Sequence, residues 1–195
     1  MFENIIKNVH NRHPLIHCIT NYVSINDCAN IVLACGGAPI MAEDINEVSQ
    51  ITSICQGLDI NIGMLNDNKL SSMLKAGATA NELGIPVILD PVGAGSSDYR
   101  IKAVQNLMSN VQFGVIRGNV SEIKAIAAKQ GIHNIAAGVY ETMQKNKSAM
   151  GVEAGIADKI TDDNIKEMAD FINKLSQKTG AVTVSYTHLT LPTIA

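Results

Sequence analysis

The 195-residue sequence has little charge and few aromatic residues, and it contains no tryptophan. Charged residues make up 17% of the chain, below the roughly 25% of an average globular domain, whereas hydrophobic residues make up 46%. These values exclude the disordered class, which combines low hydrophobicity with high charge. They suit a chain that buries much of its surface, in a two-sided sheet or in an interface between subunits.

The sequence lacks the features typical of nucleic-acid-binding, membrane-spanning and secreted proteins. The formal net charge is −3, so no broad positive surface and no nucleic-acid partner are expected. Every apolar run is shorter than the roughly 18 residues of a membrane helix, so no membrane partner is expected. The N-terminus lacks a long apolar stretch and a small-residue cleavage site, so we expect no signal peptide and a cytoplasmic location.

The four cysteines include no C-x-x-C pair, the spacing that would favour a zinc site. Cys18, Cys28, Cys35 and Cys55 lie in apolar surroundings, and we interpret them as small buried hydrophobic residues. His17 lies inside an apolar run, which favours a core residue over a metal ligand.

Short apolar segments alternate with longer segments of helical period through most of the chain. Strands that are apolar on both faces, each followed by a helix, are typical of a parallel sheet covered on both sides. The predicted fold class is therefore α/β, with a mostly parallel sheet. The predicted strands cover residues 15–19, 38–41, 58–62, 86–89, 113–116 and 181–184.

The predicted helices lie between these strands, and most of them end at a glycine, which favours the left-handed conformation that follows helices. The segment Thr161-Asp162-Asp163 is expected to cap a last amphipathic helix that ends at Gly180. Residues 133–158 are interpreted as a connection with one helix. The other predicted helices cover residues 27–35, 44–55, 66–83, 101–108 and 121–130.

The last residues differ in character from the rest of the chain. Residues 185–193 show no helical period, and the sequence ends in Pro-Thr-Ile-Ala, typical of translated adapter or vector sequence. We therefore expect residues 1–183 to form one incomplete α/β domain and residues 184–195 to be a non-native tail.

Polar residues and glycines follow the predicted strands one after another. In an open parallel sheet the carboxyl ends of the strands share one edge, where such folds bind ligands. Thr20-Asn21-Tyr22 follows the first strand, Met41-Ala42-Glu43-Asp44 the second and Asn61-Ile62-Gly63 the third. Turns favour the same residue types, so ordinary loop composition is the alternative explanation.

The fourth strand ends in Asp90-Pro91-Val92-Gly93-Ala94-Gly95. A carboxylate there could order a cation or a hydroxyl, and the glycines could bring backbone N–H groups close to a phosphate. The alternative is a tight turn after a buried strand. The segment lacks the third glycine of a dinucleotide fingerprint, and the chain contains no P-loop motif.

The fifth strand leads into Arg117-Gly118-Asn119-Val120-Ser121-Glu122. Arg117 can clamp a phosphate through two parallel hydrogen bonds. Asn119 and Glu122 have the spacing of a capping box, and that structural role explains Glu122 at least as well as a metal role would.

These segments, together with Pro14-Leu-Ile-His-Cys-Ile-Thr-Asn-Tyr-Val23 and Gly37-Ala-Pro-Ile-Met-Ala42, resemble the hydroxyethylthiazole kinase family. The resemblance covers Met1 to about Val182 and implies a ribokinase-like fold. It also implies phosphorylation of the primary alcohol of 4-methyl-5-(2-hydroxyethyl)thiazole, a step of thiamine salvage, with ATP as co-substrate and Mg²⁺ as cofactor. The family's members assemble as homotrimers with active sites at subunit interfaces.

The resemblance implies a thiazole pocket made by four residues. Met41 matches the methionine that contacts the thiazole, and its flexible thioether suits a flat heteroaromatic ring. Asn21, Val23 and Gly63 match other parts of the wall of this pocket.

The resemblance also implies roles toward ATP and metal. Arg117 matches the arginine that binds the ATP phosphates, and Asp90 lies at the nucleotide edge of the site. Asn119 and Glu122 match the N-x-x-E motif of the superfamily, which implies that Asn119 lies at the ATP site and that Glu122 orders Mg²⁺ through water.

The sequence departs from the family after Val182. Family members continue into a Thr-Gly turn that contacts ATP and a G-T-G-C motif that forms the anion hole, and neither follows Val182 here. We therefore assign no catalytic residue and expect a kinase domain without its last strands and helices. The alternatives are an inactive fragment that only binds ligand, and another kinase of the superfamily with a hydroxymethylpyrimidine or pyridoxal substrate.

Overall fold

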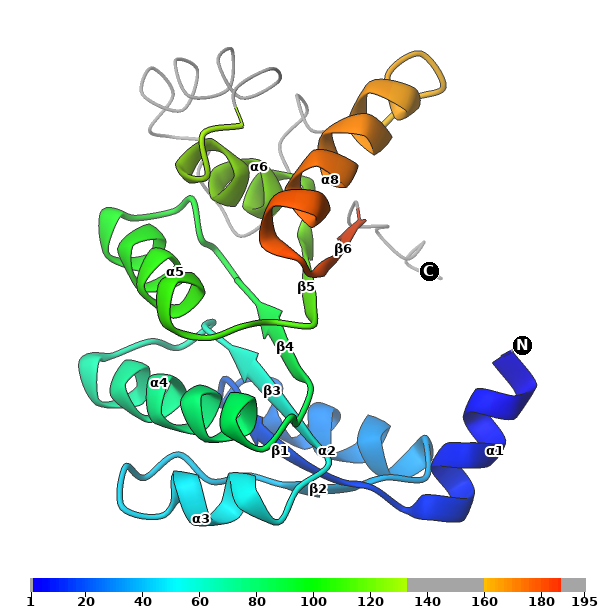
Figure 1. Cartoon of the computed structure of the whole chain (residues 1–195), viewed down its shortest axis with the longest axis vertical. Helices are drawn as coiled ribbons and strands as arrows, with labels where there is room; N and C mark the ends of the chain where they lie inside the picture. Colours follow the sequence, from blue (N-terminus) through cyan, green and yellow to red (C-terminus); the bar gives the residue numbers. More distant parts are fainter. Residues whose placement is uncertain (1, 133–159, 187–195) are drawn as a thin grey trace, which may run out of the picture. The chain divides into compact units, whose positions relative to one another are not determined.

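Residues 2–132 and 160–186 are described by a computed structural model (Figure 1). The chain divides into two compact units, residues 1–90 with 106–114 and residues 91–105 with 115–195. The predicted connection at 133–158 and residues 187–195 of the predicted tail lie outside the described residues. Among the described residues, no helix has both the length and the hydropathy needed to cross a membrane.

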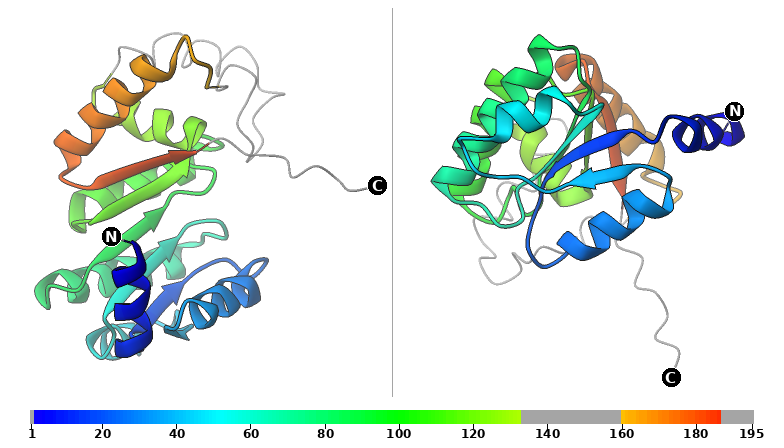
Figure 2. Two further views of the ribbon diagram at one scale, coloured as in Figure 1. Left: turned by 90° about the vertical axis from the view of Figure 1, so that its right-hand side faces the viewer. Right: turned by 90° about the horizontal axis from the view of Figure 1, so that it is seen from below.

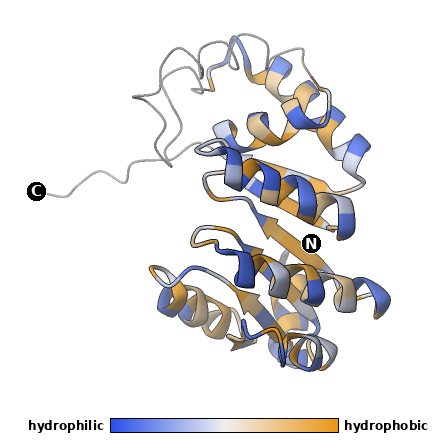
Figure 3. Ribbon diagram, turned by 90° about the vertical axis from the view of Figure 1, so that its left-hand side faces the viewer, coloured by the Kyte–Doolittle hydropathy of each residue, from blue (hydrophilic) through white to orange (hydrophobic). Residues whose placement is uncertain are grey.

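The first unit contains four parallel strands in the order β2-β1-β3-β4. Their register places Ile19 beside Ile60, and Asn61 beside Asp90. Figure 3 colours the strands mainly as hydrophobic, as expected for strands buried on both faces. The strands are β1 (Leu15–Ile19), β2 (Ala38–Ile40), β3 (Gly57–Asn61) and β4 (Val87–Asp90).

Helices cover both faces of these strands. In the right-hand view of Figure 2, α2 (Ile25–Ala34) lies on one side of β1 and β2, and α3 (Val48–Ser53) and α4 (Asp67–Glu82) lie on the other. Helix α4 packs on β3 and β4, and α3 packs on α4. Helix α1 (Phe2–Arg12) precedes β1 and extends away from the strands (Figure 2).

The second unit contains β5 (Val115–Asn119) and β6 (Val182–Tyr186), which pair in parallel. Helix α6 (Val120–Lys129) packs against both strands, and α8 (Ile165–Thr179) packs against β6. Residues 184–186, which the sequence assigns to the tail, continue β6 and pair with residues 117–119. Helix α5 (Asp98–Asn110) begins in this unit and ends in the first.

The predicted α/β class is confirmed, and each predicted strand is present with ends displaced by at most three residues. The glycines expected to end helices at positions 36, 84, 131 and 180 all have φ between 68° and 91°. Glycine is favoured there because this left-handed conformation is costly for residues with a Cβ atom.

Two predicted helices begin at the wrong residue, and one helix has no prediction. Helix α1 has no predicted counterpart, although Ile5, Ile6 and Val9 recur at helical spacing. Helix α3 is shorter than predicted, because the Asp44 side chain accepts the backbone N–H of Asn46 at 2.8 Å and a turn replaces the first residues. Helix α8 starts after Asn164, whose side chain accepts from the Thr161 N–H instead of capping the helix.

The buried face of α4 is lined mainly by small residues around Met73. Leu83, which the predicted helix includes, lies just after α4 and is more than half exposed. Small side chains let α4 approach its neighbours closely. The buried residues of α4 are Lys69, Ser72, Met73, Ala76, Gly77 and Ala80.

The close approach of α4 predicts the effect of a substitution at Gly77. A Cβ atom at this position would lie 2.5 Å from Cγ2 of Val111. Alanine normally stabilises a helix relative to glycine by roughly 1 kcal/mol. We expect Gly77→Ala to lower the free energy of unfolding by about 1–3 kcal/mol instead, because of overpacking. Chemical denaturation measures this change.

The control for this experiment is Val111→Ala, which removes the methyl groups that the new Cβ atom would meet. In the double variant the two substitutions should cost less than the sum of their separate effects. A Gly77→Ala variant as stable as the wild type would contradict the close contact.

Candidate active site

Side-chain hydrogen bonds connect the carboxyl ends of β1, β3 and β4. Asn21 Nδ2 donates to Asn61 Oδ1 at 3.3 Å, and Asn61 Nδ2 donates to Asp90 Oδ2 at 3.1 Å. Asn61 Oδ1 also accepts the backbone N–H of Gly63 at 2.8 Å. The structure therefore brings three of the predicted site residues, Asn21, Gly63 and Asp90, together around Asn61.

Asn61 is the centre of this network; sequence reasoning placed it among the polar residues at the strand ends but gave it no site role. An amide side chain suits the position because it can accept from two neighbours and donate to a third. Its only signal in the sequence was its place at the end of a predicted strand. A Cβ atom at Gly63 would lie 3.0 Å from both Asn21 Nδ2 and Asn61 Oδ1, so position 63 needs a small residue.

Asn21 also fixes the loop that leads into α2. Its Oδ1 accepts from the backbone N–H of Ser24 at 3.0 Å and from the Ser24 hydroxyl at 3.1 Å. Between them, Tyr22 is 54% exposed and Val23 is 88% exposed. The loop therefore holds Val23, a predicted thiazole contact, in an exposed position.

Met41 lies half-buried in the segment after β2. The backbone carbonyl of the next residue, Ala42, is hydrogen-bonded to His17. His17 Nε2 donates to the Ala42 carbonyl at 2.8 Å, and Nδ1 lies 2.9 Å from Thr52 Oγ1. Burial lowers the pKa of His17, which favours the neutral ring, and the Thr52 hydroxyl donates to the Val48 carbonyl at 2.7 Å. The prediction that His17 is a core residue is confirmed, and this residue positions the chain beside Met41.

A buried lysine connects the loops after β1 and β2. Lys69, in the first turn of α4, is 3% exposed. Its Nζ donates to the Thr20 carbonyl at 2.5 Å, pairs with Glu43 at 2.8 Å and lies 4.5 Å from the centroid of the Tyr22 ring. The Tyr22 hydroxyl donates to Glu43. Lys69 thus holds both loops against α4.

The electrostatics of this cluster favour an ionised carboxylate. Burial by itself would raise the pKa of Glu43, but the hydrogen bonds from Lys69 and Tyr22 outweigh burial and hold that pKa below its usual value. The hydrogen bond to Glu43 raises the pKa of Tyr22, so the phenol stays protonated. Sequence reasoning missed Lys69, whose signal was its spacing of four residues from Met73 on the same helix face.

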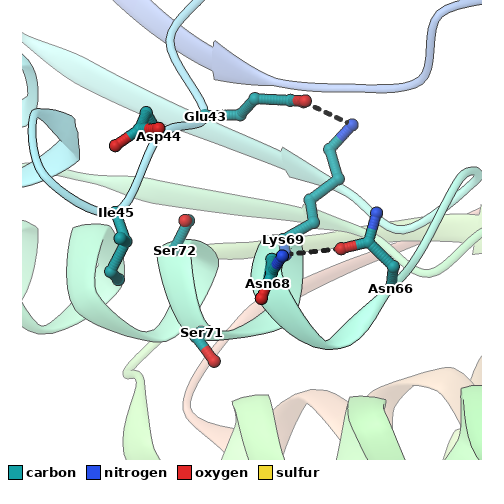
Figure 4. A pocket seen from close by; sticks show the side chains of 8 residues that line it. All are labelled: Glu43, Asp44, Ile45, Asn66, Asn68, Lys69, Ser71 and Ser72. Atoms are coloured by element: carbon teal, nitrogen blue, oxygen red, sulfur yellow. Dashed lines mark hydrogen bonds and ion pairs between the residues drawn. The ribbon is translucent and has the colours of Figure 1, made fainter.

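A pocket of about 570 Å³ lies beside this cluster (Figure 4). Figure 4 shows Lys69 reaching toward Glu43, while Asn66 caps α4 by accepting from the Lys69 backbone N–H at 2.9 Å. The predicted thiazole contacts are not among the described residues that line this pocket. The lining residues are Glu43, Asp44, Ile45, Asn66, Asn68, Lys69, Ser71 and Ser72.

In the second unit, both carboxylate oxygens of Glu122 accept backbone N–H groups. Oε2 accepts from Asn119 at 2.8 Å, and Oε1 accepts from Gly93 at 2.8 Å. Asn119 Oδ1 in turn accepts the Glu122 N–H at 2.9 Å, which completes the predicted capping box. Glu122 is 4% exposed and ties the start of α6 to the glycine-containing loop.

The loop that begins at Pro91 is held by bonds within the second unit. The Ala94 N–H donates to the Pro91 carbonyl at 2.9 Å, and Arg100 donates to the Val92 carbonyl at 2.8 Å. The N–H groups of Gly93 and Ala94 therefore serve the protein itself. At these two residues the bonds are those that the tight-turn alternative expects.

Arg117 is exposed on β5, and its guanidinium carbon lies 4.5 Å from the centroid of the Tyr186 ring on β6. The ring stacks against the cation without neutralising it. Tyr186 belongs to the predicted tail, so the orientation of Arg117 depends on a residue of that segment.

Comparisons with known proteins agree with the motifs of the sequence. The model of the hydroxyethylthiazole kinase family matches residues 6–162. A hydroxyethylthiazole kinase of Clostridium acetobutylicum is 52% identical over 93% of this chain and 61% of that protein. A hydroxyethylthiazole kinase of Desulfovibrio desulfuricans is 45% identical over 94% of this chain and 59% of that protein. The chain thus spans about 60% of the length of these relatives.

A solved structure supports the same relationship. The hydroxyethylthiazole kinase protein of Pyrococcus horikoshii OT3 is 38% identical, with a TM-score of 0.64. The similarity covers 72% of this chain and 53% of that one.

Glu122 accepts two backbone N–H groups, and this predicts the effect of replacing its carboxylate by an amide. Glu122→Gln replaces one oxygen with an NH₂ group, which would face the N–H of either Asn119 or Gly93. We expect the free energy of unfolding to fall by about 1–3 kcal/mol, because a buried donor loses its partner. Denaturation with urea at neutral pH measures the loss.

Asn119→Ser is the matched control, since serine keeps an oxygen that can cap α6. It should cost less than Glu122→Gln. Equal stability of Glu122→Gln and the wild type would show that the carboxylate does not bridge the two N–H groups.

Proposed function

The chain belongs to the hydroxyethylthiazole kinase family, and we propose that it serves the phosphorylation of 4-methyl-5-(2-hydroxyethyl)thiazole by ATP in thiamine biosynthesis. The match of the family model to residues 6–162 carries this proposal, because that range includes every predicted site residue. The chain spans only part of its relatives, so the activity itself is a proposal. A cytoplasmic location is part of the same proposal.

We propose that the thiazole binds beside Met41, with Asn21, Val23 and Gly63 forming the rest of its pocket. The support for Met41 is its half-buried thioether, which can pack against a flat ring while His17 holds the adjacent carbonyl. The support for Asn21 and Gly63 is their hydrogen-bonded network with Asn61. Val23 leaves an apolar side chain for a ligand or a second subunit to cover.

We propose that Arg117 binds the phosphates of ATP, and that Asp90 and Asn119 contribute to the nucleotide site. Arg117 is exposed and carries a charge that can neutralise phosphate oxygens. Phosphoryl transfer depends mainly on positioning and on stabilising charge, which suits an exposed arginine carried by a strand of the sheet.

We propose that Glu122 orders Mg²⁺ through water. Its two oxygens already accept backbone N–H groups, so the carboxylate is held in one orientation and cannot turn freely toward a metal. Such a group suits hydrogen bonding to metal-bound water, and carboxylate oxygen is the ligand type that Mg²⁺ prefers. When bound, the ion would neutralise charge on the phosphates.

An ATP-dependent phosphorylation assay with the thiazole alcohol tests this function. The assay uses this chain and a second chain extended through the G-T-G-C motif of the family. We expect the extended chain to phosphorylate the thiazole alcohol, and Met41→Ala to raise its KM on the order of tenfold because ring packing is lost.

Met108→Ala is the matched control, since Met108 is a half-buried methionine on α5 and should leave KM unchanged. Phosphorylation of a pyrimidine or pyridoxal alcohol by the extended chain, without phosphorylation of the thiazole, would overturn the proposal.

We also propose that the chain assembles as a homotrimer. The support is apolar surface: Ile5 and Ile6 on α1, and Ile31 and Leu33 on α2, are each more than half exposed. No residue of α2 is fully buried within the described part of the chain, although this helix is rich in apolar residues. Groups of exposed apolar side chains of this kind mark interaction surfaces.

Sedimentation equilibrium measures the assembly, and we expect a mass three times that of the 20.8-kDa chain. Ile31→Glu should dissociate the trimer, because it places a charge in the apolar surface. Asn30→Glu adds the same charge at a neighbouring exposed position and should leave the trimer intact. A wild-type chain that sediments as a monomer would contradict the proposal.

A further inference from the structure

Two cysteines and an aspartate meet between α2 and the strands of the first unit. Cys18 on β1, Cys28 on α2 and Asp59 on β3 place their sulfur and carboxylate ligand atoms within 4.8 Å of one another. Cys18 and Asp59 are paired in the parallel register of β1 and β3, so their side chains leave the same face of the sheet. Sequence spacing did not reveal the group, because its members come from three separate elements.

The group is anchored in the core and open on one side. Cys18 is almost fully buried, whereas Cys28 and Asp59 are half-buried. Asp59 lies in the middle of a parallel strand, where charged residues are uncommon, and its carboxylate lies near the Cys18 and Cys28 thiols. The partial exposure of Cys28 and Asp59 gives a cation a route of entry.

The spacing of the three ligand atoms suits a tetrahedral ion. The ligands of zinc lie roughly 3.5–3.8 Å apart, given bond lengths of about 2.3 Å to sulfur and 2.0–2.2 Å to oxygen. A contraction of about 1 Å therefore suffices to close the group around an ion, which side-chain rotation can supply. Three protein ligands leave one position for water.

The charges of these three side chains also favour a bound cation. Burial raises the pKa of the Cys18 thiol, and the negative charge of Asp59 raises it further. Burial and Asp59 also raise the pKa of Cys28. Burial and repulsion from the Asp59 charge both oppose the thiolate forms. A divalent cation removes this repulsion and allows both thiols to ionise.

We propose that Cys18, Cys28 and Asp59 form a binding site for a thiophilic divalent cation, for which Zn²⁺ is the best fit. Cysteine sulfur selects zinc over Mg²⁺ or Ca²⁺, and the mixed sulfur and oxygen ligands are of the types that zinc accepts. The bound ion connects α2 to β1 and β3. This site is independent of the proposed phosphorylation, so a result against one proposal is not a result against the other.

Zinc titration of the reduced, metal-free chain against a chromophoric chelator tests the site. We expect one Zn²⁺ per chain, with about two protons released as the thiols ionise. Cys28→Ser and Asp59→Asn should each weaken binding by on the order of tenfold or more, because each removes one of three ligands. Circular dichroism checks that each variant is folded.

Cys35→Ser is the matched control, since Cys35 is an exposed thiol at the C-terminal end of α2 and lies outside the group. It should bind zinc as the wild type does. Equal loss of binding in Cys35→Ser and Cys28→Ser would indicate surface thiol binding and overturn the proposal. Absence of zinc binding by the wild type, or unchanged binding by Asp59→Asn, would also overturn it.

Two further measurements separate zinc binding from thiol oxidation. Affinity should rise with pH, because Cys18 and Cys28 must lose protons; the charge of Asp59 opposes this at both thiols, and Cys55 opposes it at Cys18. Co²⁺ should give a thiolate charge-transfer band that Cys28→Ser weakens, because only one thiolate ligand then remains. The proposal would be contradicted if the oxidised protein formed a Cys18–Cys28 disulfide and the reduced protein gave no Co²⁺ band.

Discussion

Parallel pairing of β1, β3 and β4 is the constraint on which the first unit depends. Strands that run in the same direction bring their carboxyl ends to one edge, so the residues that follow them meet there. The hydrogen bonds from Asn21 to Asn61 and from Asn61 to Asp90 are a direct consequence. The same register sets Cys18 beside Asp59 on one face of the sheet, where α2 contributes Cys28.

Buried polar side chains position the loops at which the predicted site residues lie. His17 holds the carbonyl beside Met41, Lys69 holds the loops after β1 and β2, and Glu122 holds the loop after Pro91. A buried polar group is costly without its partners, so each of these loops is kept in one arrangement. Binding residues on the loops are thereby preorganised by the core rather than by their own interactions.

Much of the fold could be predicted because it follows from local physical chemistry. Apolar runs between glycines located the strands, and glycines at positive φ ended the helices, as at Gly84 and Gly180. The capping box of Asn119 and Glu122 was also evident, because its spacing is local. The errors lie where particular side-chain bonds compete with helical propensity: Asp44 holds a turn ahead of α3, and Asn164 bonds to Thr161 instead of capping α8.

The sequence by itself determined the α/β class, the order of the strands along the chain, and the membership of a kinase family with its set of expected site residues. These properties depend on residue type and on spacing within short segments. Only the tertiary structure decided that Asn61 links Asn21 to Asp90, that Lys69 is buried against Glu43, and that Cys18 lies near Cys28 and Asp59. The physical reason is that these contacts join residues far apart in the chain, and strand register and helix packing set their distances.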